Sequence, residues 1–213
     1  MQLYGKDSDY SILPTPRCFN LVELSSANSE RERLRHLVQG WDPEGLIDCL
    51  DPISKHLLFG LALTVGSACG SHPPSREKCL AAFTATNKGK LMAGARAWSK
   101  HSHRSEEYEN GGTKRMGWWG KPSGPVAGIN EKSLELFERV MDGATWKNLH
   151  WLPHQILVYE VRVEEGYGMR WSQDRSGVGA VGGDLTEETE PPWTMRGFVE
   201  PMMENGHELG WRH

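Results

Sequence analysis

The feature of this sequence that most constrains its fold is a strand, turn and strand pattern in its last third. Apolar side chains occupy alternate positions and share one face of an extended backbone: Leu157, Tyr159, Val161 and Val163. The opposite face starts apolar and turns polar at Glu160 and Arg162. Gly166-Tyr-Gly168 predicts a turn, after which residues 169–172 return as a paired strand. With a last strand over residues 194–200, the pattern predicts a small, mostly antiparallel sheet.

The first hundred residues carry helix signals instead. Ser29-Glu-Arg-Glu32 matches a capping box and predicts a helix that runs to about Gly40. Asp42-Pro43 and Asp51-Pro52 each place a capping carboxylate before a proline that suits a first helical turn. The helix after Asp51 is expected to end at Gly66 and to be the central core helix. Its apolar residues lie on most sides: Ile53, Leu57, Leu58, Leu61, Ala62 and Val65.

Three further helices are predicted. Pro73-Pro-Ser75 begins one of them, and a second runs from about residue 91 to residue 100. The second contains small residues that allow a neighbouring element to approach closely: Ala93, Gly94, Ala95 and Ala97. Asn130 is expected to cap the third, which ends at Gly143. Residues 106–128 and 173–191 are expected to be loops.

The predicted fold class is therefore α+β, with a helical N-terminal half packed on the small antiparallel sheet of the C-terminal half. Residues 1–28 are expected to form an extended surface segment, because Pro14 and Pro16 favour extended backbone. Residues 29–213 are expected to form a single domain, in which 29–100 is the helical part and 101–213 carries the sheet and the site. A chain of 213 residues can bury a core without disulfides or a metal.

Composition restricts the partners. The net charge of -4 disfavours broad electrostatic binding to nucleic acid or to anionic membranes, although a local basic cleft is compatible with an acidic total. Nucleic acid is therefore an unlikely partner that the sequence does not exclude. No apolar stretch approaches the roughly 20 residues of a membrane span, and the N-terminus lacks the layout of a signal peptide. A cytoplasmic or nuclear location is expected.

Cysteine usage points to free thiols. The sequence has four cysteines and no CxxC pair. Cys69, His72 and Cys79 lie close in sequence, but structural zinc sites normally use four ligands. We expect this stretch to be a loop between helices.

Histidines form the first candidate site. His101 and His103 would share one side of an extended segment and could bind a metal or act as an acid and base pair. On a helical backbone the two rings would diverge by about 200 degrees, because a helix has about 3.6 residues per turn. The segment then reads as a cationic helix end, together with Lys100 and Arg104.

The predicted sheet supplies a second group. Glu160 and Arg162 share one strand face, either as an ion pair at the edge of the core or as one wall of a cleft. Past the turn, Arg170 could hold an anion and Trp171 could stack on a ligand ring. A surface arginine is the alternative for Arg170.

The tail adds a carboxylate and an imidazole. Glu200 and His207 lie in a turn-rich segment and suit general acid-base chemistry. Metal binding by His101, His103, His207 and Glu200 is equally compatible with the sequence, although HExxH spacing is missing. GxSxG, P-loop, GxGxxG and kinase motifs are also missing.

Several motifs together resemble a protein family of plants and fungi that has no assigned activity. The matching elements are His103-Arg-Ser105, Gly117-Trp-Trp-Gly120, Gly166-Tyr-Gly-Met-Arg-Trp171 and the tail from Gly197 to His213. The resemblance covers a little over half of the chain. It implies that residues 106–116 and 173–191 are peripheral insertions, and it locates a site without naming a reaction.

Three functional hypotheses follow. The first is an enzyme, a hydrolase or transferase, that grips an anionic small molecule through arginines while His or Glu moves a proton. The second is a metal-dependent enzyme that uses the histidines, and the third is a binding or scaffold protein with a tryptophan-rich contact surface. The cofactor is left open and no metal ligand is assigned. The expected catalytic residues are His103, Glu160, Glu200 and His207, and the expected substrate-binding residues are Arg104, Arg162, Arg170, Trp118, Trp119 and Trp171.

Overall fold

The centre of the structure is a four-stranded antiparallel sheet with the strand order β3-β4-β5-β6. Its strands are β3 (Trp146–Leu152), β4 (Ile156–Arg162), β5 (Gly168–Asp174) and β6 (Thr194–Val199). The computed structural model describes residues 15–38, 49–105, 117–177 and 190–202, and the backbone of a two-stranded hairpin, β1 (Glu107–Tyr108) and β2 (Lys114–Arg115). This arrangement confirms the predicted α+β class.

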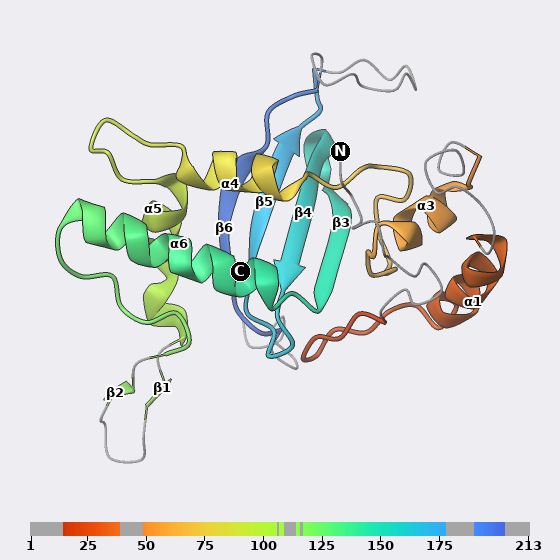
Figure 1. Cartoon of the computed structure of the whole chain (residues 1–213), viewed down its shortest axis with the longest axis horizontal. Helices are drawn as coiled ribbons and strands as arrows, with labels where there is room; N and C mark the ends of the chain where they lie inside the picture. Colours follow the sequence, from red (N-terminus) through yellow and green to blue (C-terminus); the bar gives the residue numbers. More distant parts are fainter. Residues whose placement is uncertain are drawn as a thin grey trace.

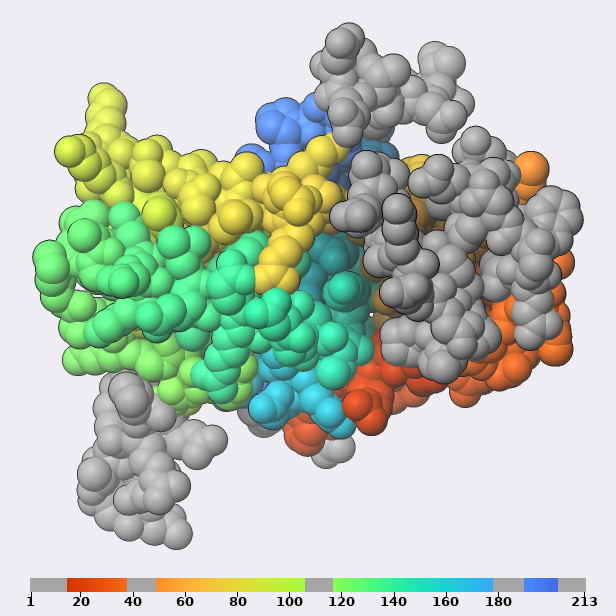
Figure 2. All heavy atoms as spheres, viewed as in Figure 1, coloured from red at the N-terminus to blue at the C-terminus, as the bar shows by residue number. Residues whose placement is uncertain are grey.

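Three helices pack against this sheet. They are α4 (Arg76–Thr84), α5 (Ala93–His101) and α6 (Val126–Asp142). Helices α4 and α6 form a layer over one face of the strands, with α4 in contact with β6 and α6 in contact with β4, whereas α5 lies along the β6 edge and contacts β6 and α6 (Figure 1). From that side α4 and α6 hide most of the sheet (Figure 2). No helix in the described part of the chain is long and apolar enough to cross a membrane.

The alternating pattern of the strands explains this layer. Leu157, Tyr159 and Val161 are buried in the main core, because side chains of a strand point to opposite faces in turn. The neighbouring strands add further core residues from the same face: Leu149, Met169, Trp171 and Phe198. The helices supply the other half of this core through Phe83, Trp98, Phe137 and Val140.

The helix after Asp51 is not the central core helix. Helix α3 (Pro52–Leu58) is short, and it ends before Gly60, whose positive φ of 68° favours glycine and stops the helix. With α1 (Ala27–Val38) it forms a separate, smaller core of five buried residues: Ala27, Leu34, Leu57, Leu58 and Leu63. This unit lies beside β3 (Figure 1). The prediction failed because residues 61–68 are not helical and instead bond to the β3 backbone, with Ala62 N donating to Lys147 O at 2.7 Å and Ala68 N to Leu149 O at 2.8 Å.

Two predicted helix starts are also displaced. Helix α1 begins at Ala27, and the Ser29 hydroxyl donates to Ser26 O at 2.8 Å instead of capping the Glu32 amide. Helix α6 begins at Val126, so Asn130 lies inside it. The Asn130 side chain accepts from Met92 N at 3.0 Å and donates to Lys90 O at 2.9 Å, which ties α6 to the loop before α5. The predicted helix at Asp42-Pro43 lies outside the described residues.

Gly94 lets α4 and α5 approach each other closely, as the run of small residues in α5 predicted. A Cβ added there would lie 2.0 Å from Cζ of Phe83, a fully buried ring on α4. Gly94→Ala is therefore expected to lower the free energy of unfolding by about 1–3 kcal/mol, because the core around Phe83 must shift. Chemical denaturation measures this.

Gly128→Ala is the matched control. It lies in α6 and its added Cβ would meet nothing within 4 Å, so it should be neutral or stabilising by up to about 1 kcal/mol. Equal destabilisation by both substitutions would contradict the packing described for Gly94.

Candidate active site on the polar face of the sheet

The sheet face opposite the helices carries the polar side chains. Register places Asn148 of β3 opposite Glu160 of β4, Glu160 opposite Arg170 of β5, and Arg170 opposite Gly197 of β6. These residues therefore form one row across all four strands, on the side away from the helix layer. His150 lies on this face two residues along β3 from Asn148.

Glu160 is the centre of this row. Its Oε1 accepts from Nε of Arg162 at 2.6 Å, and its Oε2 accepts from Nε of Arg170. Burial raises the pKa of Glu160, but the two guanidinium groups outweigh burial and bring the pKa down to about 2. Glu160 is therefore ionised at neutral pH and serves as the shared anchor of both arginines.

The two arginines differ in what they can contact. Arg162 is fully buried, and its Nη1 also donates to Gly166 O at 2.5 Å and to Glu200 O at 2.7 Å. Arg170 keeps 23% of its side chain exposed. Arg162 therefore holds the chain after β6 against the sheet, whereas Arg170 is available to an anion.

A cavity of about 480 Å³ opens over this face, and we call it the sheet groove. Its floor is formed by sheet residues: Trp146, Asn148, His150, Glu160, Arg162 and Arg170. Its wall comes from segments outside the sheet, namely Leu21 and Val22, residues 64–66 and Met202. The size is within the range of small-ligand sites.

His150 is the groove residue that the sequence prediction missed. Burial lowers the pKa of its imidazole; Glu160 acts in the opposite direction, while Arg170, Arg162 and Arg196 lower the pKa further. The ring is therefore neutral at pH 7 and can accept a proton. His150 was hard to find from the sequence, because strand β3 was not predicted. Lys147, Asn148 and His150 interrupt the apolar pattern of that strand.

A second polar cluster lies at the β6 edge of the sheet. His101 Nδ1 is 3.8 Å from Glu200 Oε1, and Arg104 Nη1 is 3.8 Å from Glu200 Oε2. Gly197 lies beside it, since a Cβ there would be 3.9 Å from His101 Nε2. The buried atoms His101 Nδ1 and Glu200 Oε1 have no hydrogen-bond partner among the described residues. Three candidates from the sequence, His101, Arg104 and Glu200, thus lie together here. Arg162 connects this cluster to Glu160, because it also donates to Glu200 O.

His103 does not join either group. The backbone is helical through His101 and continues as a short 3-10 helix over Ser102–Ser105, which leaves His103 exposed and separates it from His101. His207 lies outside the described residues. Within those residues, no three His, Cys, Asp or Glu side chains are placed to hold a metal ion, and this includes Cys69, His72 and Cys79.

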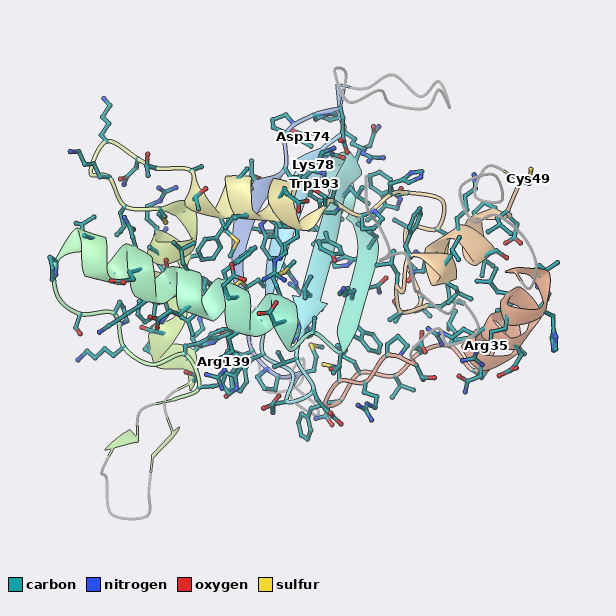
Figure 3. The ribbon with its side chains drawn as sticks, in the orientation of Figure 1. Arg35, Cys49, Lys78, Arg139, Asp174 and Trp193 are labelled. Carbon is teal, nitrogen blue, oxygen red and sulfur yellow. The ribbon has the colours of Figure 1, made fainter. Side chains whose placement is uncertain are left out.

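The predicted stacking tryptophans are engaged in packing. Trp171 and Trp119 are buried in the main core, where Trp171 Nε1 donates to Cys79 O at 3.0 Å. Trp118 stacks on Tyr167 with ring centroids 4.9 Å apart, and Arg139 of α6 (Figure 3) covers it at 3.7 Å. This corrects the expectation that these rings stack on a ligand, because their faces already contact protein groups.

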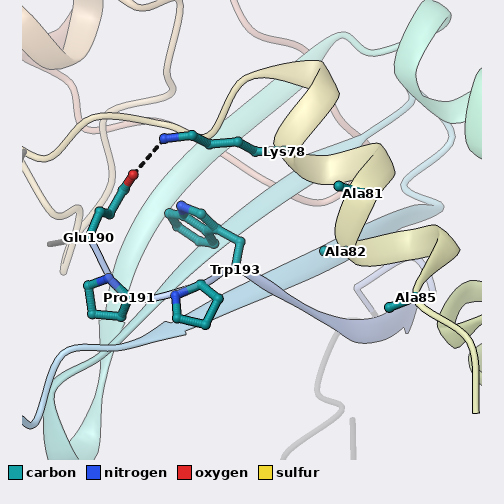
Figure 4. A pocket seen from close by; sticks show the side chains of 8 residues that line it. Lys78, Ala81, Ala82, Ala85, Glu190, Pro191 and Trp193 are labelled. Carbon is teal, nitrogen blue, oxygen red and sulfur yellow. Dashed lines mark hydrogen bonds and ion pairs between the residues drawn. The ribbon is translucent and has the colours of Figure 1, made fainter. Parts of the chain in front are cut away.

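A second cavity, of about 370 Å³, lies between α4 and the segment before β6. Lys78 and Glu190 form an ion pair of 2.6 Å at one side of it, next to Trp193 (Figure 4). The rest of its lining is small or apolar: Ala81, Ala82, Ala85, Pro191 and Pro192. With its two charges paired to each other, this cavity offers less for chemistry than the sheet groove.

A comparison with known protein families matches the middle of the chain. A family model described as the CdiA C-terminal tRNase toxin domain matches residues 81–181, which is somewhat under half of the 213 residues. The matched range includes α5, α6 and strands β3 to β5 and therefore the floor of the sheet groove, whereas Glu200 and the N-terminal wall lie outside it. No curated protein and no solved structure matches the chain.

Proposed function

We propose that this protein is an RNA-cleaving enzyme, with transfer RNA as its substrate class and the sheet groove as its active site. The observation that carries the proposal is the grouping of His150, Glu160 and Arg170 on one sheet face. Their positions lie within the range that is similar to a tRNase toxin domain. The arginines predicted an anionic substrate. The proposal specifies that this substrate is a phosphodiester.

Arg170 is the proposed phosphate ligand. Its Nε donates to Glu160, which leaves the outer nitrogens of its planar guanidinium for phosphate oxygens. Glu160 fixes the direction of that guanidinium and is itself a poor base, because two cations hold its pKa at about 2. Glu160 and Arg162 are therefore positioning residues, and Arg170 stabilises the charge that develops on phosphorus-bound oxygens.

His150 is the proposed base. In its neutral form the imidazole takes the proton of a ribose 2′-hydroxyl, and the 2′-oxygen forms a bond to the adjacent phosphorus. The bond from phosphorus to the 5′-oxygen breaks, and that oxygen takes a proton from solvent. The products are a 2′,3′-cyclic phosphate and a new 5′-hydroxyl end. DNA lacks the 2′-hydroxyl and is not cleaved by this route.

The acidic net charge of the chain does not oppose this function. The groove gathers Arg162 and Arg170, with Arg196 close enough to affect the His150 pKa, although the whole chain has a net charge of -4. A local basic site can bind phosphate while the rest of the surface repels it. The sequence-based expectation that nucleic acid is an unlikely partner is therefore revised.

The test is an incubation of the purified chain with transfer RNA, with single-stranded DNA of equal length, and with EDTA added to a parallel RNA reaction. We expect RNA fragments that end in 2′,3′-cyclic phosphate, intact DNA and the same cleavage with EDTA, because guanidinium and imidazole groups carry the proposed step. Intact RNA, or equal cleavage of DNA, would overturn the proposal.

A further inference from the structure

The floor of the sheet groove carries charged side chains, whereas its wall carries apolar ones. Val22 and Val65 are 85% and 87% exposed, and both line the groove. Two exposed apolar side chains beside one cationic cavity distinguish this wall from apolar groups that are exposed singly.

This wall comes from a part of the chain that the matched range does not include. Val22 and Val65 precede residue 81, where the family match begins. Two contacts fix the wall to the sheet: Asn148 Nδ2 donates to Thr64 Oγ1 at 2.9 Å, and Ser67 Oγ donates to Asn148 Oδ1 at 3.1 Å. The neighbouring residue Glu23 pairs with the buried Arg31 at 2.6 Å. The patch is thus held by the fold and is not a loose loop.

The groove is larger than a phosphate group requires. A volume of about 480 Å³ leaves room for more than the phosphate at Arg170. A phosphodiester is joined through ribose to a flat, largely apolar base, and flat rings gain most from contact with aromatic and aliphatic surfaces. Charge on the floor and apolar surface on the wall therefore complement the two ends of one nucleotide.

We propose that Val22 and Val65 form a nucleobase subsite, which restricts the enzyme to unpaired nucleotides. A base in a duplex is stacked between its neighbours and cannot reach the wall, whereas a base in a loop can turn out and stack on a side chain. The inference rests on the proposed function of the same groove. It adds that a loop of the RNA is the part that is cut.

The variant that tests the subsite is Val22→Ser with Val65→Ser. Both side chains are almost fully exposed, so the fold should tolerate the change. With a single-stranded RNA substrate we expect KM to rise about tenfold, the factor that corresponds to the burial of one or two aliphatic side chains. The value of kcat should stay within about twofold, because the wall does not contact the reacting atoms.

Val126→Ser is the matched control, since Val126 is an exposed valine on α6 that does not line the groove. It should leave KM unchanged. Cleavage of a perfectly paired RNA duplex by the unmodified enzyme should be at least tenfold slower than cleavage of the same strand alone. An unchanged KM in the double variant, or equal cleavage of duplex and single strand, would overturn the subsite while RNA cleavage itself stands.

Binding without catalysis separates the two proposals. Calorimetry with adenosine 5′-monophosphate and with ribose 5-phosphate compares a phosphate that carries a base with one that does not. We expect tighter binding of the nucleotide by the unmodified chain, and equal binding of the two by the double variant. If RNA stays intact but this difference is present, the cleavage proposal fails and the base subsite stands. If the unmodified chain binds both equally, the subsite fails.

Discussion

Replacing His150 with alanine is expected to lower the rate of RNA cleavage by about 10²- to 10⁴-fold, the range typical for loss of a general base. The effect should fall on kcat, because Arg170 still binds the phosphate through its guanidinium. The fold should persist, since His150 is only half-buried and joins the sheet through its backbone. Single-turnover kinetics on a short RNA, with circular dichroism of the variant, measures both.

Two other histidines serve as controls. His103→Ala should retain full activity, because this exposed side chain lies outside both polar groups. His101→Ala tests the cluster at Glu200 and should alter kcat much less than the His150 variant does. Loss of activity in His101→Ala together with near-normal activity in His150→Ala would contradict the assignment and move the base to the β6 edge.

The pH dependence of kcat/KM checks the same assignment. A base must be unprotonated to work, so activity should fall as pH falls through the pKa of His150. Burial and the nearby arginines place that pKa below the ordinary histidine value of 6.5. The acidic limb should therefore lie below pH 6.5. A profile that rises as pH falls would show that the imidazolium form is the active one.

The largest effect on stability is expected for Arg162→Met, at about 3–5 kcal/mol. The substitution leaves the buried Glu160 carboxylate with Arg170 alone. It also removes the donor for the carbonyls of Gly166 and Glu200. Urea denaturation at pH 7 measures the loss. Arg196→Met, an exposed arginine of β6, is the control and should change stability by less than about 0.5 kcal/mol.

Glu160 provides an independent check through pH. Its pKa is held at about 2, below the ordinary value of 4.5, so its ionised form is favoured in the folded state. That contribution to stability is complete above pH 4.5 and is lost as pH falls towards 2. In Glu160→Gln the stability should change less with pH in this window. If the pH dependence is unchanged, Glu160 is not the charge that the two arginines stabilise.

The double variant Arg162→Met with Glu160→Gln separates charge from packing. If an uncompensated carboxylate causes most of the loss in Arg162→Met, removing that carboxylate should restore part of the stability. Additive losses would show instead that the carbonyl contacts of Arg162 dominate.

Parts of the site could be predicted from sequence because strand alternation needs no tertiary information. Alternation placed Glu160 and Arg162 on one face, and the Gly166-Tyr-Gly168 turn placed Arg170 on the facing strand. His150 could not be found in this way, because β3 has too few apolar positions to be recognised as a strand before its partner is known. The sequence could not show whether His101 and His103 share a side, because the end of α5 was ambiguous between extended and helical backbone.

The tryptophans show the same limit. Side-chain type does not distinguish a ring that stacks on a ligand from one that fills a core, and Trp119 and Trp171 turned out to be core residues. The tail with His207, which the sequence marks as a candidate, lies outside the described residues. Its role, the resemblance to the plant and fungal family and the cellular location stay predictions.

The sequence by itself determined the fold class, the central β4–turn–β5 unit and the shared strand face of Glu160 and Arg162, because these depend on local periodicity and turn chemistry. Only the tertiary structure decided which sheet face stays free of helices, that β3 brings His150 to that face, and that residues 22 and 65 form its wall. The wall depends on contacts between segments far apart in the chain, such as Ser67 with Asn148, which is 81 residues away. No local pattern records such contacts.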